Sequence, residues 1–459
     1  MKIISVPYKS VKTGLNILKS NYHLNYGKKR IERALKNDKP FKPLKDIVNS
    51  VYTGGIFKRF FVENEEYGLP YISAQHMMEA NPSSVAKTIS KKYTPRQDDM
   101  TLRKNQILVS CAGTVGNVRL ISQDLDGVIG SQDIIRIISD DKKMDFGYLY
   151  AYLSTATAYN FIQSFIYGSV VPRIDPNTLS DIPIPIISED KILIVSSLIK
   201  ESTLLREQSI QKLNDAHYIF NEVLDYNEES WKFHTYSSKI ISKNYHKRLD
   251  STFYLNVELP DKELRKEKYN SIPLGKLVKV KMFNAQRGKR NYVEQGGIQF
   301  LSTSNIGEKN PLLVNKFLSL KTDGLDSLIV QKDWILVSSS GQDILGSCFI
   351  VNETYAGSAV NQHSIRVIVD EKKISPFYVY AFLSNPRVKK YLRAGIYGSA
   401  VLTINEDFLK HVLIPMLSDD AITEIIELTK KHVEYFEEAC FKEKEAIDIV
   451  EKEIDLWQE

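Results

Sequence analysis

Two clusters of basic residues carry the clearest potential chemistry in this sequence. Lys58 and Arg59 form the first cluster, and Arg287, Lys289 and Arg290 form the second, each in a glycine-bearing loop. Long basic side chains in loops can reach the phosphates of a nucleic acid, and an arginine can also hydrogen-bond the major-groove edge of guanine. These clusters therefore indicate a surface that binds nucleic acid.

Loop residues with amide, hydroxyl, imidazole or phenol groups form a second set of candidates, because such groups can hydrogen-bond base edges or the DNA backbone. For any one of them the alternative is an ordinary loop residue. We predict base contacts at Gln75, His76, Gln132, Ser304, Asn305, Gln342, Gln362 and His363. Residues that shape a turn or touch the DNA backbone are predicted to be Tyr167, Ser169, Tyr397 and Ser399, and Arg173 is a further predicted DNA-binding residue.

The sequence contains no constellation typical of an enzyme active site. Gly113-Thr-Val-Gly116 lacks both the third glycine of a dinucleotide fingerprint and the Lys-Ser/Thr of a P-loop, and the histidines and cysteines lack metal-ligand spacing. The carboxylates Asp261, Glu263 and Glu267 could hold a nuclease metal, but they fall in one compact charge run that is typical of a solvated helix. We therefore expect no catalytic residue, no metal and no cofactor in this chain.

The candidate residues are carried by a repeated framework. Residues 131–187 align with residues 361–417 at a constant shift of 230, with 21 identities in 57 positions and no gap. Upstream, the run ILVS at 107–110 recurs at 335–338. The polar candidates differ between the copies while the framework agrees, which is the pattern expected of two readers of different sequences. Short β-branched and aromatic runs broken by Gly, Asn and Asp predict strands, and a helical stretch follows in each copy.

Each copy is followed by a segment with a heptad pattern. Over the last 40 residues apolar or small side chains recur at spacings of 4 and 3, interrupted by Glu443, and a similar pattern after the first copy is interrupted by Arg206 and His217. A sustained heptad pattern predicts long helices that bury their seams against each other. The alternative is that each helix packs only onto its own module. The seam residues on which helix pairing and partner assembly would depend are Ile199, Leu213, Phe220, Val433, Phe436, Ile447 and Ile454.

The composition is that of a globular protein with unevenly distributed charge. Hydrophobic residues make up 43% and charged residues 25% of the 459 residues, and no apolar run approaches the roughly 20 residues of a membrane span. Basic residues outnumber acidic ones by 14 to 3 in residues 1–60 and by 15 to 6 in 231–300, whereas residues 418–459 hold 14 acids and 5 lysines. Basic segments that open each copy favour nucleic-acid binding. We expect a cytoplasmic protein that contacts no membrane and has three reduced thiols, Cys111, Cys348 and Cys440.

The order of these features resembles the specificity subunit of Type I restriction-modification systems, and the resemblance covers nearly the whole chain. The matching segments of the first copy are VYTGGIF, PYISAQHM, NQILVSCAGTVGNV and IYGSVVPRIDPNTLSDIPIPII. Those of the second copy are FLSTSNI, DWILVSSSGQDILGS and IYGSAVLTINEDFLKHVLIPML. Arg248-Leu249-Asp250 and the residues after it resemble the segment that often opens a recognition domain in this family.

The resemblance implies an α+β fold with two tandem mixed α/β target-recognition domains, separated by two long antiparallel coiled-coil helices. The corresponding boundaries are residues 1–187 for the first target-recognition domain, 188–230 for the central long helix, 231–417 for the second target-recognition domain and 418–459 for the C-terminal long helix. The alignment of the repeat supports the two-domain division.

The resemblance also implies a function, that of a non-catalytic reader of a bipartite site on double-stranded DNA. Two DNA methyltransferase subunits would dock on the helices, and a restriction subunit is an optional further partner. S-adenosylmethionine would then be bound only by the partner methyltransferase. Two alternatives stay open: the chain could itself cleave or modify DNA, or it could be a protein-binding scaffold of two repeats. A scaffold predicts no salt-sensitive DNA affinity.

Overall fold

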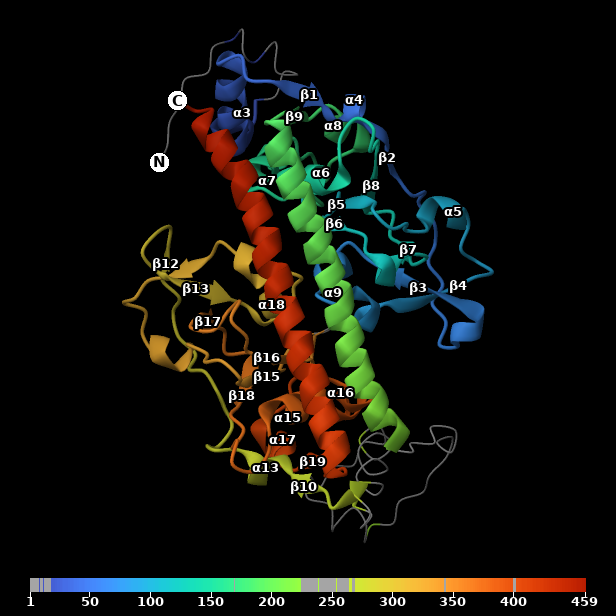
Figure 1. Ribbon diagram of the computed structural model, residues 1–459, viewed down its shortest axis with the longest axis vertical. Helices are drawn as coiled ribbons and strands as arrows, with labels where there is room; N and C mark the ends of the chain where they lie inside the picture. The colour runs from blue at the N-terminus through green and yellow to red at the C-terminus, as the bar shows by residue number, and fades with distance from the viewer. Residues whose placement is uncertain are drawn as a thin grey trace. The chain divides into compact units, whose positions relative to one another are not determined.

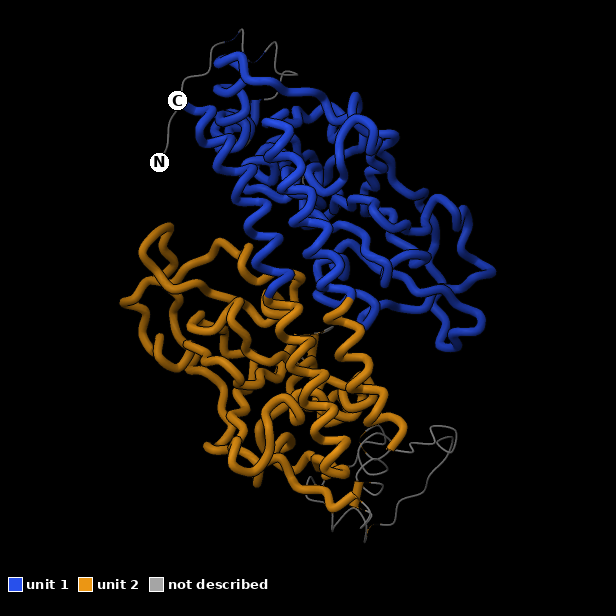
Figure 2. Tube along the Cα trace, viewed as in Figure 1, with its two compact units in different colours: residues 1–207, 438–459 blue, residues 208–437 orange. Residues whose placement is uncertain are grey.

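The computed structural model describes residues 8, 11, 18–168, 170–223, 238, 253, 264–265, 269–341, 344–398 and 402–459. They form two compact units. Unit 1 comprises residues 1–207 and 438–459, and unit 2 comprises residues 208–437 (Figure 2). Both units contain sheets and helices, which confirms the predicted α+β class.

The strands of unit 1 form two small sheets and a two-stranded ribbon. They are β1 Phe41–Pro43, β2 Val48–Thr53, β3 Gly68–Ile72, β4 Lys87–Ser90, β5 Ile107–Ser110, β6 Val118–Leu120, β7 Ile129–Gly130, β8 Ile134–Ser139 and β9 Pro183–Pro185. The larger sheet has the order β2-β8-β5-β6, and the smaller has the order β4-β3-β7 with β3 and β7 parallel. All four residues of β5 are buried, as the run of Ile, Leu and Val predicts for a central strand.

Unit 2 repeats this topology. Its strands are β10 Ile272–Pro273, β11 Phe283–Asn284, β12 Tyr292–Val293, β13 Ile298–Leu301, β14 Phe317–Leu318, β15 Ile335–Ser338, β16 Cys348–Ile350, β17 Ala359–Val360, β18 Ser364–Val367 and β19 Leu413–Ile414. The counterpart of the larger sheet has the order β11-β18-β15-β16. The counterpart of the smaller sheet, which keeps that name here, has one more strand than in unit 1 and the order β12-β14-β13-β17, with β13 and β17 parallel. The ribbon pairs β10 with β19, as β1 pairs with β9 in unit 1.

Short helices flank and connect the strands of both units. In unit 1 they are α2 Ser20–Leu24, α3 Tyr26–Lys36, α4 Leu44–Ile47, α5 Gln97–Met100, α6 Phe146–Leu153, α7 Ala156–Ser164 and α8 Pro176–Ser180. In unit 2 they are α13 Leu274–Leu277, α14 Thr303–Ile306, α15 Pro376–Ser384, α16 Pro386–Ala394 and α17 Glu406–Leu409. Asp145 and Thr155 cap α6 and α7 by accepting backbone N–H bonds, and Ser375 and Asn385 do the same for α15 and α16.

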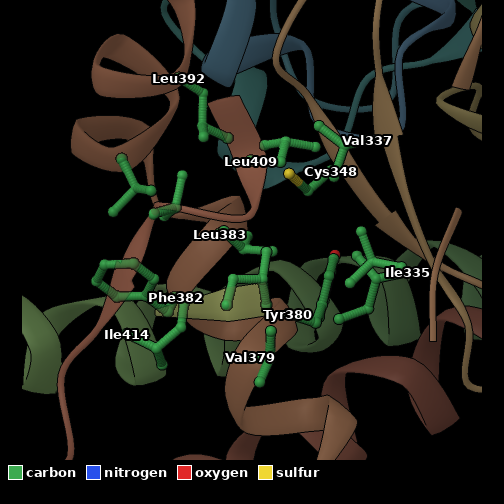
Figure 3. Packing of buried hydrophobic residues seen from close by; sticks show 14 of the residues in the cluster. Ile335, Val337, Cys348, Val379, Tyr380, Phe382, Leu383, Leu392, Leu409 and Ile414 are labelled. Carbon is green, nitrogen blue, oxygen red and sulfur yellow. The ribbon is translucent and has the colours of Figure 1, made fainter. Parts of the chain in front are cut away.

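The repeated Tyr-x-Tyr-Ala segment anchors the core of each unit. Tyr148 is fully buried and its hydroxyl donates to the carbonyl of Pro185 at 2.6 Å, and the equivalent Tyr378 donates to Pro415 at 2.7 Å. In each copy the tyrosine therefore joins the helical segment to the strand that ends the copy. In unit 2, the apolar side chains of α15 pack on β15 and β16 in one buried cluster (Figure 3).

Two long helices, α9 Glu189–Val223 and α18 Asp419–Leu456, contain 35 and 38 residues and are unbroken (Figure 1). At 1.5 Å per residue each is more than ~50 Å long. The boundary between the two units falls within each long helix, after residue 207 in α9 and after residue 437 in α18. The boundaries predicted from the sequence instead treat each helix as a segment separate from the modules. The physical reason is that the two parts of each helix pack in different units.

Within each unit the two helices run antiparallel. In unit 1, Lys191 is paired with Glu453, and Arg206 with Glu443, so residue numbers rise on one helix as they fall on the other. Of the predicted seam residues, Leu213 and Phe436 are half-buried. The remaining ones are buried: Ile199, Phe220, Val433, Ile447 and Ile454. No helix in the described part of the chain is long and apolar enough to cross a membrane.

Candidate nucleic-acid interface

The loops that carry most candidate residues in unit 1 meet at one edge of its sheets. Thr53 at the end of β2 and Ser110 at the end of β5 pair with Ile135 and Ile134, so both strands end where β8 begins. In the smaller sheet β3 ends at Ile72, whose carbonyl accepts the backbone N–H of Ser131 in the loop before β8 at 3.0 Å. The loops after β2, β3 and β5 and the loop before β8 therefore share an edge, which we call the loop edge.

Unit 2 has an equivalent loop edge. Asn284 of β11 pairs with Ile365, and Ser338 at the end of β15 pairs with Ser364, so these strands end where β18 begins. The carbonyl of Leu301, at the end of β13, accepts the backbone N–H of Asn361 at 3.1 Å, which joins the smaller sheet to the same edge. The topology thus brings the candidate loops of each copy together, although they are far apart in the sequence.

At the loop edge of unit 1, the side chains of Lys58, Arg59 and Gln75 are exposed. Nη1 of Arg59 donates to the Tyr71 hydroxyl at 3.1 Å. Gln132 is half-buried. His76 differs from the others because it is only 5% exposed, so its imidazole is covered by protein and this placement disfavours the predicted base contact.

The tyrosine of the shared Ile-Tyr-Gly-Ser segment is held by a pair of backbone hydrogen bonds at each loop edge. Tyr167 and Arg173 exchange backbone hydrogen bonds of 2.8 and 2.9 Å, and Tyr397 and Thr403 exchange two bonds of 2.9 Å. Gly168 has a φ of +90°, and a Cβ there would lie 2.4 Å from the Val171 carbonyl, so only glycine fits. Tyr167 and Tyr397 are both exposed, and Nη1 of Arg173 lies 3.7 Å from a carboxylate oxygen of Asp133.

Three predicted residues, Ser169, Gln342 and Ser399, lie outside the described residues.

A side-chain network connects three loops at the loop edge of unit 2. Nη2 of Arg290 donates to Oε1 of Gln362 at 3.0 Å, and Nε2 of Gln362 lies 3.2 Å from Nε2 of His363. Nδ1 of His363 lies 2.8 Å from the Ser340 hydroxyl. Burial, and then the charge of Arg287, lower the pKa of His363, so the imidazole is neutral at physiological pH. Lys289 and Arg287 are exposed beside this network.

The two polar residues predicted in α14 have different environments. Ser304 is exposed. Asn305 completes a capping box: its Oδ1 accepts from the backbone N–H of Ser302 at 3.0 Å, and its amide donates to Glu308 at 3.0 Å. The side chain of Asn305 therefore holds the start of the helix. Gln132 and Gln362 occupy the same repeat position and are identical, so this pair does not differ between the copies as the other polar candidates do.

Two buried arginines, which the sequence reasoning missed, hold the loops before β8 and β18. Arg136 is fully buried and donates to the carbonyls of Gly130 and Ile134, both at 2.9 Å. Arg366, its repeat equivalent, donates to Val360 at 2.7 Å and to Asn361 at 3.0 Å. Burial, and then the charge of Arg290, lower the pKa of Arg366 to about 10, and it stays charged at neutral pH. The sequence signal for this role was an arginine at the same position of both copies, within an otherwise apolar predicted strand.

The two glycine loops of the repeat connect neighbouring strands. The Gly113 to Gly116 loop joins β5 to β6, and Gly341 to Gly346 joins β15 to β16. Asp261, Glu263 and Glu267 lie outside the described residues. In the described part of the chain, no three His, Cys, Asp or Glu side chains gather as metal ligands do. Burial raises the pKa of the Cys111 thiol to about 11 and that of Cys348 to about 12, so both stay protonated at neutral pH.

Comparison with known proteins connects the first copy to a described family. Residues 36–215 match the family model of the Type I restriction modification DNA specificity domain. This segment contains both sheets of unit 1 and the beginning of α9. None of the curated proteins matches the chain.

Solved structures of low sequence identity match along most of the chain. The S subunit of a Type I restriction-modification system from M. genitalium is 15% identical, with 91% of this chain and 92% of that chain covered and a TM-score of 0.28. The HsdS subunit from Thermoanaerobacter tengcongensis is 11% identical, with 90% and 95% covered and a TM-score of 0.29. A structure described under complex assembly and conformational transition of the type I R-M system is 12% identical, with 91% and 96% covered and a TM-score of 0.30.

Proposed function

We propose, from the premise that residues 36–215 are a Type I restriction modification DNA specificity domain, that this chain is the non-catalytic specificity subunit of a DNA methylation complex. In this role it reads a bipartite site on double-stranded DNA and directs two partner methyltransferase subunits to that site. A restriction or translocase subunit is a further partner, and S-adenosylmethionine binds only to the methyltransferase. The complex works in the cytoplasm.

The observation that supports DNA reading most strongly is that each unit has its own loop edge, built from equivalent strands. Each edge presents an exposed basic pair, Lys58 with Arg59 from the loop after β2 in unit 1 and Arg287 with Lys289 from the loop after β11 in unit 2. Each also presents amide or hydroxyl side chains from loops that follow other strands. Cations position a protein on the phosphates, and fixed polar groups can discriminate base edges. Two such edges in one chain suit a site made of two halves.

Arg290 is the residue that we expect to contribute most to base reading in unit 2. Nη2 donates to Gln362 and to the Gln286 carbonyl, both at 3.0 Å, which fixes the plane of the guanidinium. Nη1 is buried and has no acceptor among the described residues, so it is an unsatisfied donor. When the side chain turns outward, the guanidinium can hydrogen-bond the O6 and N7 atoms of guanine, whereas a lysine cannot make the same paired contact.

The long helices are the proposed binding surface for the methyltransferase. In unit 1 they leave the apolar side chains of Leu193, Leu204 and Phe441 exposed, each by 47% or more. The helix α18 lies in the segment with 14 acids and 5 lysines, a charge that repels DNA phosphates. A protein partner is therefore favoured over DNA on this surface.

The experiment that tests DNA reading uses the complex of this chain with the methyltransferase that co-purifies with it. Arg290→Ala should lower the affinity for a cognate duplex by about 10- to 100-fold, the range expected for loss of a base contact. Strand-resolved methylation sequencing should show relaxed specificity in one half of the motif only. Lys372→Ala is the matched control, because Lys372 is exposed in the turn that follows the opposite end of β18.

Unchanged affinity and an unchanged motif in Arg290→Ala would remove this loop from the interface. The wild-type complex separates the alternatives. A protein-binding scaffold shows no salt-sensitive DNA affinity, and its deletion leaves the methylated motifs of the host unchanged. A nuclease or modification enzyme shows metal-dependent activity in the purified chain that Asp261→Ala or Glu263→Ala abolishes.

A further inference from the structure

A basic and aromatic element recurs at the start of both smaller sheets. Residues 58–61 read Lys-Arg-Phe-Phe and residues 289–292 read Lys-Arg-Asn-Tyr, at a shift of 231. The structure places the two elements equivalently. Phe61 forms a β-bridge with Ile89 beside β4, and Tyr292 of β12 pairs with Leu318 of β14. The final aromatic residue therefore sits at the same position on the sheet in each unit.

A lysine from the neighbouring strand covers the ring of this aromatic residue in both units. Nζ of Lys87 lies 5.8 Å from the ring centre of Phe61, and Nζ of Lys316 lies 4.4 Å from that of Tyr292. A second, buried ring supports the first edge to face with centroids 5.9 Å apart, Tyr71 under Phe61 and Phe300 under Tyr292. A lysine, an exposed ring and a buried ring thus have the same arrangement in both units, although the sequences around them differ.

The packing of the core does not account for these outer rings. Phe61 is 52% and Tyr292 is 51% exposed, whereas Tyr71 and Phe300 are 2% and 6% exposed. Both lysines are exposed, and neither forms an ion pair with a carboxylate of the described residues. A half-exposed aromatic ring with an ammonium group beside it offers both an apolar face and a positive charge to one ligand.

We propose that Phe61 with Lys87 in unit 1, and Tyr292 with Lys316 in unit 2, form a sequence-independent clamp for the DNA sugar–phosphate backbone next to each read half-site. The ring packs on deoxyribose and the lysine binds a phosphate. The inference rests on the proposed DNA-reading function and adds a second kind of contact to it. Lys58 and Lys289, three residues before each ring, contribute further charge.

Two observations favour DNA as the ligand of the clamp. The first is continuity with the loop edge: Lys87 pairs with Tyr71, one residue before the end of β3, and Arg59 donates to the same tyrosine. The second is charge, because Arg59 and Lys87 both lie near the carboxyl end of β3. The exposed glutamates Glu63, Glu65 and Glu66 precede β3, so a phosphate is favoured at its carboxyl end.

The test is the salt dependence of DNA binding by the methyltransferase complex. Lys87→Gln and Lys316→Gln should each lower the slope of log affinity against log salt by about 0.9, the value expected for one lost phosphate contact. Phe61→Ala and Tyr292→Ala should each weaken binding by about 5- to 10-fold. Cognate and unrelated duplexes should be affected equally, and the methylated motif should stay the same. Lys87→Arg should keep the slope, and Lys372→Gln is the control for a lysine outside the clamp.

A slope and affinity like those of the wild type in the assembled Lys87→Gln and Lys316→Gln complexes would overturn the clamp while leaving DNA reading intact. A change in the methylated motif would also overturn it, because the residue would then read bases. If the wild-type complex itself lacked salt-sensitive DNA binding, both the clamp and the proposed function would fail. Co-purification of the methyltransferase with each variant shows that the chain is folded.

Discussion

In unit 1, Tyr150 reaches the seam between α9 and α18 and donates to the Glu443 carboxylate; in unit 2, the equivalent Tyr380 reaches the seam and lies 3.4 Å from Nε2 of His432. The same tyrosine therefore meets a charged partner in one unit and a neutral one in the other. The polar interruptions of the heptad pattern are not defects, because each has a defined partner. They make the two seams chemically different although the modules are copies.

The seam of unit 1 is held by a buried ion pair. Nη2 of Arg206 donates to Oε2 of Glu443 at 2.6 Å, and Glu443 is only 2% exposed. Burial lowers the pKa of Arg206, but the carboxylate outweighs it and the net pKa is raised. Burial, and then Glu443, raise the pKa of Tyr150 well above its usual range, so its hydroxyl stays a donor. Both carboxylate oxygens are therefore bonded, as a buried charge requires.

The seam of unit 2 is held by a neutral histidine. Nδ1 of His432 lies 2.9 Å from the Ser209 carbonyl, and the Ser209 hydroxyl donates to the His432 carbonyl at 2.8 Å. These bonds assign the proton to Nδ1 and leave Nε2 to accept from Tyr380. Burial lowers the pKa of His432 to about 4, and burial, and then His432, lower that of His217 to about 3. Both rings are neutral at pH 7.

The repeat shift shows what changed after duplication. A shift of 230 takes Arg206 to Phe436 and Glu443 to Leu213, so the ion pair of unit 1 corresponds to two apolar residues in unit 2. A buried ion pair is weak support for stability, but removing one of its partners is costly. The tyrosine is thus the same in both copies, whereas the helix residues that it meets differ.

Arg206→Leu should cause the largest effect, because it leaves the buried Glu443 without its cation. We expect unit 1 to lose about 3–5 kcal/mol of stability, the range for breaking a buried pair. Hydrogen exchange should report this as faster exchange of residues 199–206 and 439–446, with little change at the seam of unit 2. The double variant Arg206→Phe/Glu443→Leu, which copies the residues of unit 2, should recover most of the loss. A single variant that exchanges like the wild type would show that the ion pair is not buried.

The sequence predicts the architecture well and the polar contacts poorly. Heptad spacing indicates both long helices, because apolar periodicity is a local signal. It marks Arg206 and Glu443 as interruptions on two separate helices, yet it cannot pair them, because a heptad pattern allows several registers. The register is fixed by Tyr150 and by the packing of each helix on its module.

The candidate site has the same division between local and tertiary information. The exposure of Lys58 and Arg59 follows from their charge and their place in a loop, because unpaired charged side chains are rarely buried. His76 and Asn305 have side-chain types that suit base reading, but the fold covers the first and uses the second as a helix cap. Arg136 was missed because a charged residue inside an apolar strand is understood only when the carbonyls around it are known. Burial and hydrogen bonding are tertiary properties that composition does not contain.

Lowering the pH should weaken the seam of unit 2. The folded-state pKa of His432, about 4, is below the unfolded value, so the unfolded chain binds protons first and stability falls as the pH drops from about 6.5 towards 4. By pH 4.5 the loss is about 2 kcal/mol, and His217 adds to it in the same direction. Urea unfolding at pH 7.5 and 4.5 measures the change. Other carboxylates titrate as well, so the diagnostic quantity is the difference from His432→Gln, whose pH dependence should be smaller. An equal pH dependence in this variant would contradict a buried neutral histidine.

Replacing each seam tyrosine by phenylalanine is the finest test of the contrast between the units. Tyr150→Phe removes a donor to a buried carboxylate and should cost about 2 kcal/mol, the range for hydrogen bonds to charged groups. Tyr380→Phe removes a long contact with a neutral ring and should cost below about 1 kcal/mol. Segment-resolved hydrogen exchange measures both, and Tyr148→Phe and Tyr378→Phe, which lose matching bonds to proline carbonyls, provide a pair that should respond equally. If Tyr150→Phe and Tyr380→Phe also responded equally, the charge of Glu443 would contribute nothing to the difference between the seams, because the two tyrosines occupy the same position in the repeat.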